Sequence, residues 1–574
     1  MTCRPRSRTL AGGFESQVTG PEPRSTRAPV TSSDDKRPPT RAELVRRLAD
    51  LSAKRRAEAM LDTVDGRPLV STLPAEDVYA TIIDVGLADS TELVQLSTPE
   101  QFVAYVDLAS WQKDRIDPLE VLHWLRAARG DDDQAFMQKL SALDIEVLEL
   151  MYKKLARLHD LEENPDVDTE GVTMETPDGK FLVEFTIEGV DEAALRRLTF
   201  DLMAHNPFEL SRFLEAVRWE TPTELEEAAF QFRQARLQDL GFPPMDEATK
   251  VFAWVDPEKV AVKAAGSALA ASQGHVDLVS AAFRGLDEIE RQNLEGEVRY
   301  LVNCVLVAEG AEPGDPAAVR QYSEYARDIL DLGLEHLTGA RAELASEVVR
   351  EKTLKEIFQL GFSLTLKLKR QVEKLAKEPG AKFGDTWLAL DEETAALNAL
   401  LRRRPLKAVK VPGADPVPFR SKRELHEAEA LLERVRDQRA VLQALLGSSP
   451  AVVVARFGVT LAELTPQRLF GAVVARAEVE GVVDPAPFPE LSLTELCTRL
   501  FEARGPTAAL RESAGKRALE VLRASFTVAG EELEVMVQRV LQVLLADLGA
   551  AWAKDGRVDA KRVIALPIAG QLPT

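Results

Sequence analysis

Thr98-Pro99-Glu100-Gln101 is the clearest copy of a helix-start signal that occurs four times between residues 72 and 224. Each copy has an N-cap acceptor, Pro at the first helical position, and Glu or Gln three residues after the cap. The cap accepts from an orphan backbone N–H, Pro has no N–H there, and the Glu or Gln reaches back to the cap amide. The other copies are Asp117-Pro118-Leu119-Glu120, Asn206-Pro207-Phe208-Glu209 and Thr221-Pro222-Thr223-Glu224.

The spacing of these starts predicts short helices that follow one another with tight connections. Thr98 and Asp117 are 19 residues apart, and Asn206 and Thr221 are 15 apart, as in an α-solenoid. Each predicted helix carries one apolar stripe and is too short to be stable alone, so it must stack on its neighbours. We expect six aliphatic and aromatic side chains to point inward, namely Val78, Ile82, Phe102, Val106, Leu122 and Leu125.

Length and composition indicate a soluble protein of several domains. The chain has 574 residues, more than one hydrophobic core usually serves. Its net charge of −21 argues against nonspecific attraction of the whole surface to nucleic acid or anionic membranes, although a local basic patch stays open to either. The three cysteines are far apart in the sequence, which argues against a disulfide framework. No apolar run approaches the ~20 residues of a membrane helix, and no secretory signal is visible. We therefore expect a cytoplasmic location.

The predicted fold class is all-α, with an α-solenoid-like N-terminal half, a longer-helix C-terminal half and one inserted β-hairpin. The hairpin follows from Pro177-Asp178-Gly179, which is strong turn chemistry, and from the alternating apolar residues after it. Before it we expect a helix over 143–158, and later a long periodic stretch over 340–377. The predicted organisation is a disordered basic tail (1–40), a solenoid-like domain (41–265, hairpin 172–187), a long-helix domain (266–404), a Pro-rich linker (405–420) and a C-terminal helical domain (421–574).

Residues 72–108 resemble known helical repeats. Leu73-Pro74-Ala75-Glu76-Asp77-Val78, the segment from Gly86 to Leu96, and Thr98-Pro99-Glu100-Gln101-Phe102-Val103 are similar to the superhelical N-terminal domain of MgtE magnesium transporters and to the middle repeats of the flagellar switch protein FliG. The transporters would imply acidic Mg²⁺ sensing, and the switch protein would imply helix stacking between subunits. The whole chain looks like a bacterial family of unknown function.

The sequence contains no motif that predicts a catalytic, cofactor or metal site. Asp166, Asp168, Glu170 and Gly171 match the start of a calcium loop, but position 12, which needs a bidentate Glu, is Pro177. No Gly-rich phosphate loop or nucleophile elbow is present, and the six histidines lack partners at metal-ligand spacing. We therefore predict no catalytic residue, no cofactor and no metal.

The clearest charge anomaly is a basic strip. From Lys367 to Lys410 there are eleven Lys and Arg against six Asp and Glu, a local charge of +5 in an acidic chain. Cations at a helix end complement the helix dipole and can pair with an acidic body, so a structural role is an alternative to binding an acidic protein or nucleic acid. The predicted partner-binding residues are Lys367, Lys369, Arg370, Lys374, Lys377, Arg402, Arg403 and Arg404.

These observations favour a noncatalytic cytoplasmic adaptor or scaffold that presents stacked helices to a protein partner. The alternative is an enzyme or a divalent-metal-responsive regulator with a site between the N- and C-terminal halves. The sequence leaves the partner's identity and homo-oligomerisation open.

Overall fold

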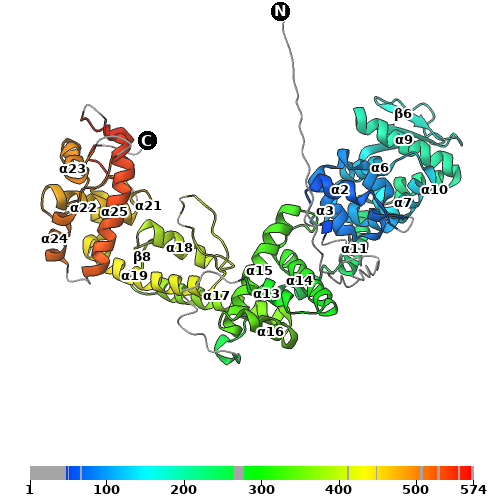
Figure 1. The fold of residues 1–574 in the computed structure, drawn as a ribbon. Helices are drawn as coiled ribbons and strands as arrows, with labels where there is room; N and C mark the ends of the chain where they lie inside the picture. Colours follow the sequence, from blue (N-terminus) through cyan, green and yellow to red (C-terminus); the bar gives the residue numbers. More distant parts are fainter. Residues whose placement is uncertain are drawn as a thin grey trace, which may run out of the picture.

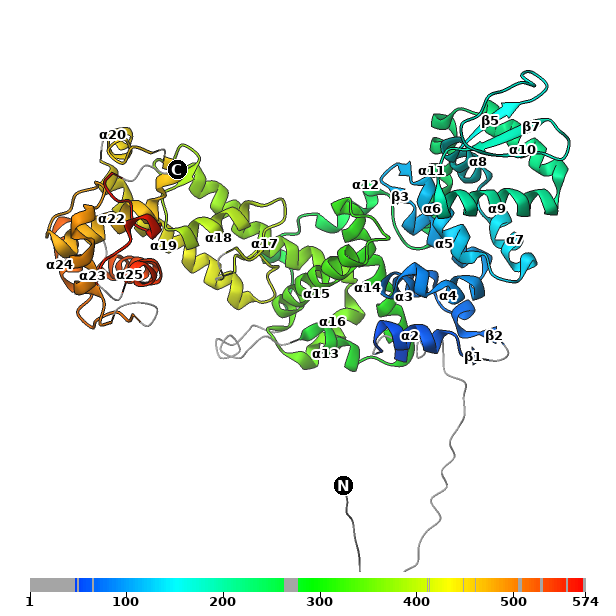
Figure 2. The ribbon, with the colours of Figure 1, turned by 90° about the horizontal axis from the view of Figure 1, so that it is seen from above.

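The computed structural model describes residues 47–48, 51–64, 67–262, 277–409, 411, 413–447, 449–459, 461–503, 508–526, 530–553 and 556–570. These residues form an elongated, bent molecule with the N-terminal helices at one end and the C-terminal helices at the other (Figures 1 and 2). Most of them are helical, and the strands are short, which confirms the predicted all-α class. The predicted tail 1–40 and the domain boundary at 265–266 lie outside the described residues.

The N-terminal region is a stack of short helices, and helices α3 to α6 and α8 each contact the helix two further along the chain. α3 packs on α5 and α5 on α7, while α4 packs on α6, α6 on α8 and α8 on α10. The six side chains predicted to point inward are all buried. The helices are α2 (Ala53–Met60), α3 (Ala75–Val85), α4 (Thr91–Leu96), α5 (Pro99–Ala109), α6 (Pro118–Ala128), α7 (Asp133–Ala142), α8 (Ile145–Leu155), α9 (Gly189–His205), α10 (Pro207–Trp219), α11 (Pro222–Asp239) and α12 (Met245–Ala248).

The four Pro-capped starts are confirmed, but the reciprocal bond forms at one of them. Thr98 caps α5, and its backbone amide donates to Gln101 in return, which completes the capping box. Asp117, Asn206 and Thr221 also cap their helices. At Asp117 the expected return bond is replaced, because Glu120 accepts from the indole of Trp124 instead.

The predicted hairpin is present as part of a larger sheet. β6 (Val172–Glu175) and β7 (Phe181–Phe185) pair antiparallel, and β5 (Ala156–Asp160) pairs with the other edge of β7. The expected helix over 143–158 is therefore wrong at its end, because α8 stops at Leu155 and the next five residues supply hydrogen bonds to β7. Smaller ladders are β1 (Thr63–Val64) with β2 (Arg67–Pro68), β3 (Trp111–Gln112) with β4 (Arg115–Ile116), and β8 (Lys382–Phe383) with β9 (Thr386–Trp387).

Longer helices form the middle of the molecule. The periodic stretch expected over 340–377 contains two α-helices, because Thr353 starts a new helix with a full capping box to Glu356. One buried core runs from Leu48 to Phe362 and so joins these helices to the N-terminal stack. The long helices of this region are α14 (Glu288–Glu309), α15 (Pro316–Thr338) and α17 (Leu354–Ala376), and the shorter ones are α13 (Leu278–Arg284), α16 (Ala345–Glu351) and α18 (Asp391–Leu401).

The C-terminal helices have a core of their own, connected to the middle by α19. Phe419 and residues of α17, α18 and α19 share one cluster, so the segment 405–420 contributes to a core as it crosses between helices. Within it, Lys407 and Val417 form an antiparallel bridge. The helices are α19 (Lys422–Leu446), α20 (Pro450–Ala455), α21 (Leu461–Leu464), α22 (Pro466–Val479), α23 (Leu493–Leu500), α24 (Lys516–Ser525) and α25 (Gly530–Ala551).

Candidate binding groove

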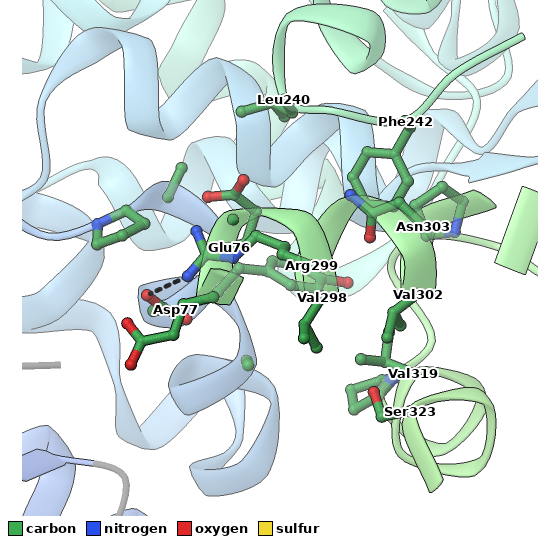
Figure 3. A pocket seen from close by; sticks show the side chains of 18 of the residues that line it. Glu76, Asp77, Leu240, Phe242, Val298, Arg299, Val302, Asn303, Val319 and Ser323 are labelled. Atoms are coloured by element: carbon green, nitrogen blue, oxygen red, sulfur yellow. Dashed lines mark ion pairs between the residues drawn. The ribbon is translucent and has the colours of Figure 1, made fainter. Parts of the chain in front are cut away.

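A large groove lies where the N-terminal stack meets the longer helices. Its walls come from α3, the turn after α11, α14 and α15 (Figure 3). Its volume is about 1590 Å³, and it is neither an enclosed cavity nor a flat surface. This volume exceeds the roughly 300–1,000 Å³ of a pocket for a small molecule. The groove is therefore large enough for part of a macromolecule.

One wall is fixed by a close backbone contact at Gly314. The hydroxyl of Tyr79 on α3 donates to the Gly314 carbonyl at 3.0 Å. A Cβ added at Gly314 would stand 2.0 Å from the carbonyl oxygen of Leu108, so no larger residue fits without moving the chain. Burial and the carboxylates of Glu120 and Asp315 raise the pKa of Tyr79, which keeps its hydroxyl a neutral donor. The start of α15 is thereby held against α3 and α5.

A second wall is the turn between α11 and α12. Gly241 has a φ of +86°, which a residue with a side chain rarely adopts, and Asn303 on α14 donates to its carbonyl at 3.1 Å. Leu240 and Phe242 on either side of this glycine line the groove, and Phe242 and Asn303 lie next to each other in Figure 3. This turn thus carries apolar side chains to the groove and is tied to α14.

The groove combines an apolar lining with charged residues. Ile289, near the start of α14, is 73% exposed although it is a large aliphatic residue. Such a side chain gains by being covered, because burying it removes apolar surface from water. The apolar side chains of the lining are Leu108, Leu240, Phe242, Phe283, Ile289, Val298, Val302 and Val319.

The charge of the groove is negative. Its lining has six carboxylates and three arginines, a net charge of −3. Each arginine pairs with a carboxylate of the groove itself: Arg56 and Arg320 with Asp84, and Arg299 with Asp77 at 4.0 Å. The other carboxylates of the lining are those of Glu76, Asp239, Glu288 and Glu295, and Glu288 also pairs with Arg291, which is not a lining residue, at 3.6 Å. A ligand that brings positive charge would meet this excess.

The predicted basic strip does not form one continuous surface. Lys367 and Arg370 lie on one face of α17. Lys367 reaches the 3₁₀ turn at Pro257–Lys259, and Arg370 reaches Trp254 in the loop before that turn. Lys367 pairs with Glu258 at 2.9 Å, and the Arg370 guanidinium lies 3.7 Å from the ring centroid of Trp254. Lys369 points elsewhere, because its Nζ donates to the Arg402 carbonyl at 2.9 Å. These three residues have partners within the chain.

Arg404 is buried, and the other four members of the strip are exposed. Arg404 pairs with Glu309 of α14, and its guanidinium stacks at 3.3 Å from the centroid of Phe252. Burial lowers the pKa of Arg404 to about 9. Within the described residues no ion pair involves Lys374, Lys377, Arg402 or Arg403, so a binding role for the strip stays a prediction centred on these four.

The acidic turn between β5 and β6, which matches the start of a calcium loop, is held by hydrogen bonds to the sheet. The backbone amides of Glu170 and Gly171 both donate to Oε1 of Glu184 on β7, at 3.2 Å. His159 on β5 contacts the other oxygen of the same carboxylate at 2.8 Å. Across the part of the chain that the structure describes, no group of three or more His, Cys, Asp or Glu side chains is arranged to hold a metal ion. No helix in that part is long and apolar enough to cross a membrane.

The sequence did not identify the residues that line the groove, because the lining comes from segments far apart in the chain. Tyr79 and Gly314 are separated by 235 residues. Two local signals do mark it: the Leu240-Gly241-Phe242-Pro243 turn, and Gly314 immediately before the Asp315-Pro316 helix start. Neither signal shows that the two segments meet.

The fold and the groove together define a protein of stacked helices. Its open groove has an apolar lining and a negative net charge, and lies between the N-terminal stack and the longer helices. The chain belongs to a family of unknown function (DUF6178), whose model matches residues 33–568. No curated protein and no solved structure matches it. The similarity of residues 72–108 to the MgtE and FliG repeats stays a prediction.

Proposed function

We propose that this protein is a noncatalytic adaptor that holds an amphipathic helix of a protein partner in the groove between α3, α14 and α15. The observation that carries the proposal is the size and lining of that groove. A cylinder of helix about 10 Å across and three turns, roughly 16 Å, long occupies about 1,300 Å³. The groove volume of about 1590 Å³ accommodates it. Apolar anchors at helical spacing in an apolar groove are a recurring mode of peptide recognition.

The charge of the groove specifies the chemistry of the partner. With a net charge of −3 in its lining, the groove favours a helix whose polar flank carries Lys or Arg. Apolar contacts supply most of the affinity, while the carboxylates select the sign of the flanking charge. The affinity should therefore fall as ionic strength rises, because a Debye length of about 10 Å at 0.1 M salt screens such contacts.

The exposed basic residues Lys374, Lys377, Arg402 and Arg403 would give the adaptor a second surface, for an acidic partner. Lys374 lies on α17, Lys377 directly follows it, and Arg402 and Arg403 directly follow α18; none of the four lines the groove. Two surfaces of opposite charge suit a protein that brings two partners together. A cytoplasmic location fits this role.

The test uses two synthetic 18-residue amphipathic helices that share their Leu positions and differ in having Lys or Glu on the flanks. Binding to the full chain is measured by fluorescence anisotropy. We expect the Lys peptide to bind, the Glu peptide to bind at least tenfold more weakly, and Ile289→Asp to weaken the Lys peptide by tenfold or more.

The chain offers a matched control for this substitution. Ile564, near the C-terminus, is also 73% exposed and does not line the groove. Ile564→Asp makes the same chemical change at the same exposure, so it should leave binding unchanged. Equal weakening by both substitutions, or equal binding of the two peptides, would refute the groove as the site.

A further inference from the structure

Helix α2, which follows the N-terminal segment, contributes to the groove. α2 begins at Ala53, and one turn later Arg56 lines the groove, where its Nη2 donates to Asp84 Oδ2 at 2.8 Å. Residues 1–46 precede the first described residue. These 46 residues therefore precede, by ten positions or more, a residue that lines the groove.

The charges of the segment and the groove are complementary. Residues 1–40 carry seven Arg and Lys against four Asp and Glu, a net charge of +3. Arg4, Arg6 and Arg8 come first and are followed by Leu10, Phe14 and Val18 at intervals of four. Side chains four apart lie on one face of a helix. Residues 4–18 thus pair basic residues with spaced apolar residues, the combination that the groove favours.

We propose that residues 4–18 bind in the groove of their own chain and compete there with the partner helix. This inference rests on the proposed function of the groove and assigns its regulation to the N-terminal segment. From Val18 to Arg47 the chain spans at most about 100 Å, so length does not prevent residues 4–18 from reaching the groove. Release of the segment opens the groove to a partner.

Tethering makes even weak binding effective. A connection of this length holds the segment near the groove at an effective concentration on the order of 0.1–1 mM. If residues 4–18 alone bind with a Kd of about 10–100 μM, they weaken partner binding by about tenfold. Reversal of the three arginines should remove most of this factor.

The native cysteines allow a direct test of where the segment binds. Cys304 and Cys497 are 1% and 0% exposed, whereas Cys3 directly precedes Arg4. A benzophenone maleimide is therefore attached at Cys3 of the folded full-length chain, the sample is irradiated at low concentration, and the cross-linked peptides are mapped by mass spectrometry. We expect monomeric products whose cross-links fall on α3, α14 and α15.

Charge-reversed variants provide the comparison. Arg4→Glu, Arg6→Glu and Arg8→Glu together should abolish the cross-links to the groove. The matched control, Arg24→Glu, Arg27→Glu and Lys36→Glu, changes the net charge equally and should leave them in place. Cross-links spread over the whole surface, cross-links in dimeric products, or equal loss in both triple variants would overturn the proposal.

Peptide binding separates this inference from the proposed function. If both are correct, the Lys peptide binds about tenfold more tightly to the Arg4, Arg6 and Arg8 variant than to the unmodified chain or the control variant. If the peptide binds all three equally and Ile289→Asp still weakens it, the groove is the site but the segment is not its competitor. If the peptide binds none of them, the proposed function itself has failed.

Discussion

A single added methyl group tests the helix crossing that supports the groove. Where α15 and α17 pack, a Cβ at Gly361 would stand 2.1 Å from the carbonyl oxygen of Ile329, and a Cβ at Gly333 would stand 2.2 Å from that of Ile357. The two glycines therefore let the backbones of these helices approach closely. Gly361→Ala forces α17 away from α15, because the opposing atom is backbone and has no rotamer to change.

The expected effect follows from two opposing contributions. Gly to Ala within a helix gains about 1 kcal/mol of intrinsic propensity. Overpacking against rigid neighbours costs up to about 3 kcal/mol. We expect Gly361→Ala to lower the free energy of unfolding of this region by about 2 kcal/mol. A double change with Gly333→Ala should cost less than the sum of the two, because one separation of the helices relieves both contacts.

Gly296 is the matched control. It lies within α14, and a Cβ there meets no atom within 4 Å. Gly296→Ala should therefore raise stability by about 0.5–1 kcal/mol. The assay is urea-dependent hydrogen–deuterium exchange, in which peptides from 316–376 should lose protection in Gly361→Ala while those from 466–551 do not. If Gly361→Ala proves as stable as Gly296→Ala, the close crossing is not present in solution.

Two further predictions concern buried charges. Burial raises the pKa of Glu149 on α8 from 4.5 to about 7, and neighbouring carboxylates add to the shift. Because the folded state binds this proton more tightly, stability should fall as the pH rises from about 4.5 to 7, and Glu149→Gln should be more stable than the unmodified chain in urea unfolding at pH 8 but not at pH 4. Arg404→Leu leaves Glu309 without its partner and should cost about 3–5 kcal/mol, with part regained by Glu309→Gln in a double-mutant cycle. In a separate double-mutant cycle, the exposed ion pair of Lys367 and Glu258 should contribute at most about 1 kcal/mol to stability. A larger value would contradict the distinction between an exposed pair here and a buried pair at Arg404.

The parts of the fold that could be predicted are those fixed within one turn of chain. Thr98 caps its helix through a bond to Gln101, three residues away, and nothing distant is needed to make it. The prediction of inward-pointing side chains was correct for the same reason, since helical geometry alone puts Val78 and Ile82 on one face. The helix start at Thr353 is equally local, because its capping box joins Thr353 to Glu356. It was not predicted because the apolar periodicity continues through this position.

The parts that could not be predicted depend on partners that are far away in the chain. Ala156 continues the apolar pattern of α8, and it becomes a strand because Phe185 offers it a pairing edge. The groove has the same origin. Its carboxylates occur from Glu76 to Glu295, so no local window of sequence shows their sum.

A local excess of charge in the sequence indicates a binding surface only where the fold does not pair or bury those charges. The strip from Lys367 to Lys410 drew attention as the densest basic stretch, but the fold pairs Lys367 with Glu258 and buries Arg404 against Glu309. The basic residues of 1–40 are less dense in the sequence, yet they precede α2, whose Arg56 lines a groove with a net charge of −3 in its lining. Opposite net charges on two connected parts of one chain attract each other at the high effective concentration of a tether. For this reason the weaker sequence signal, which precedes a helix that contributes to the groove, carries the stronger functional argument.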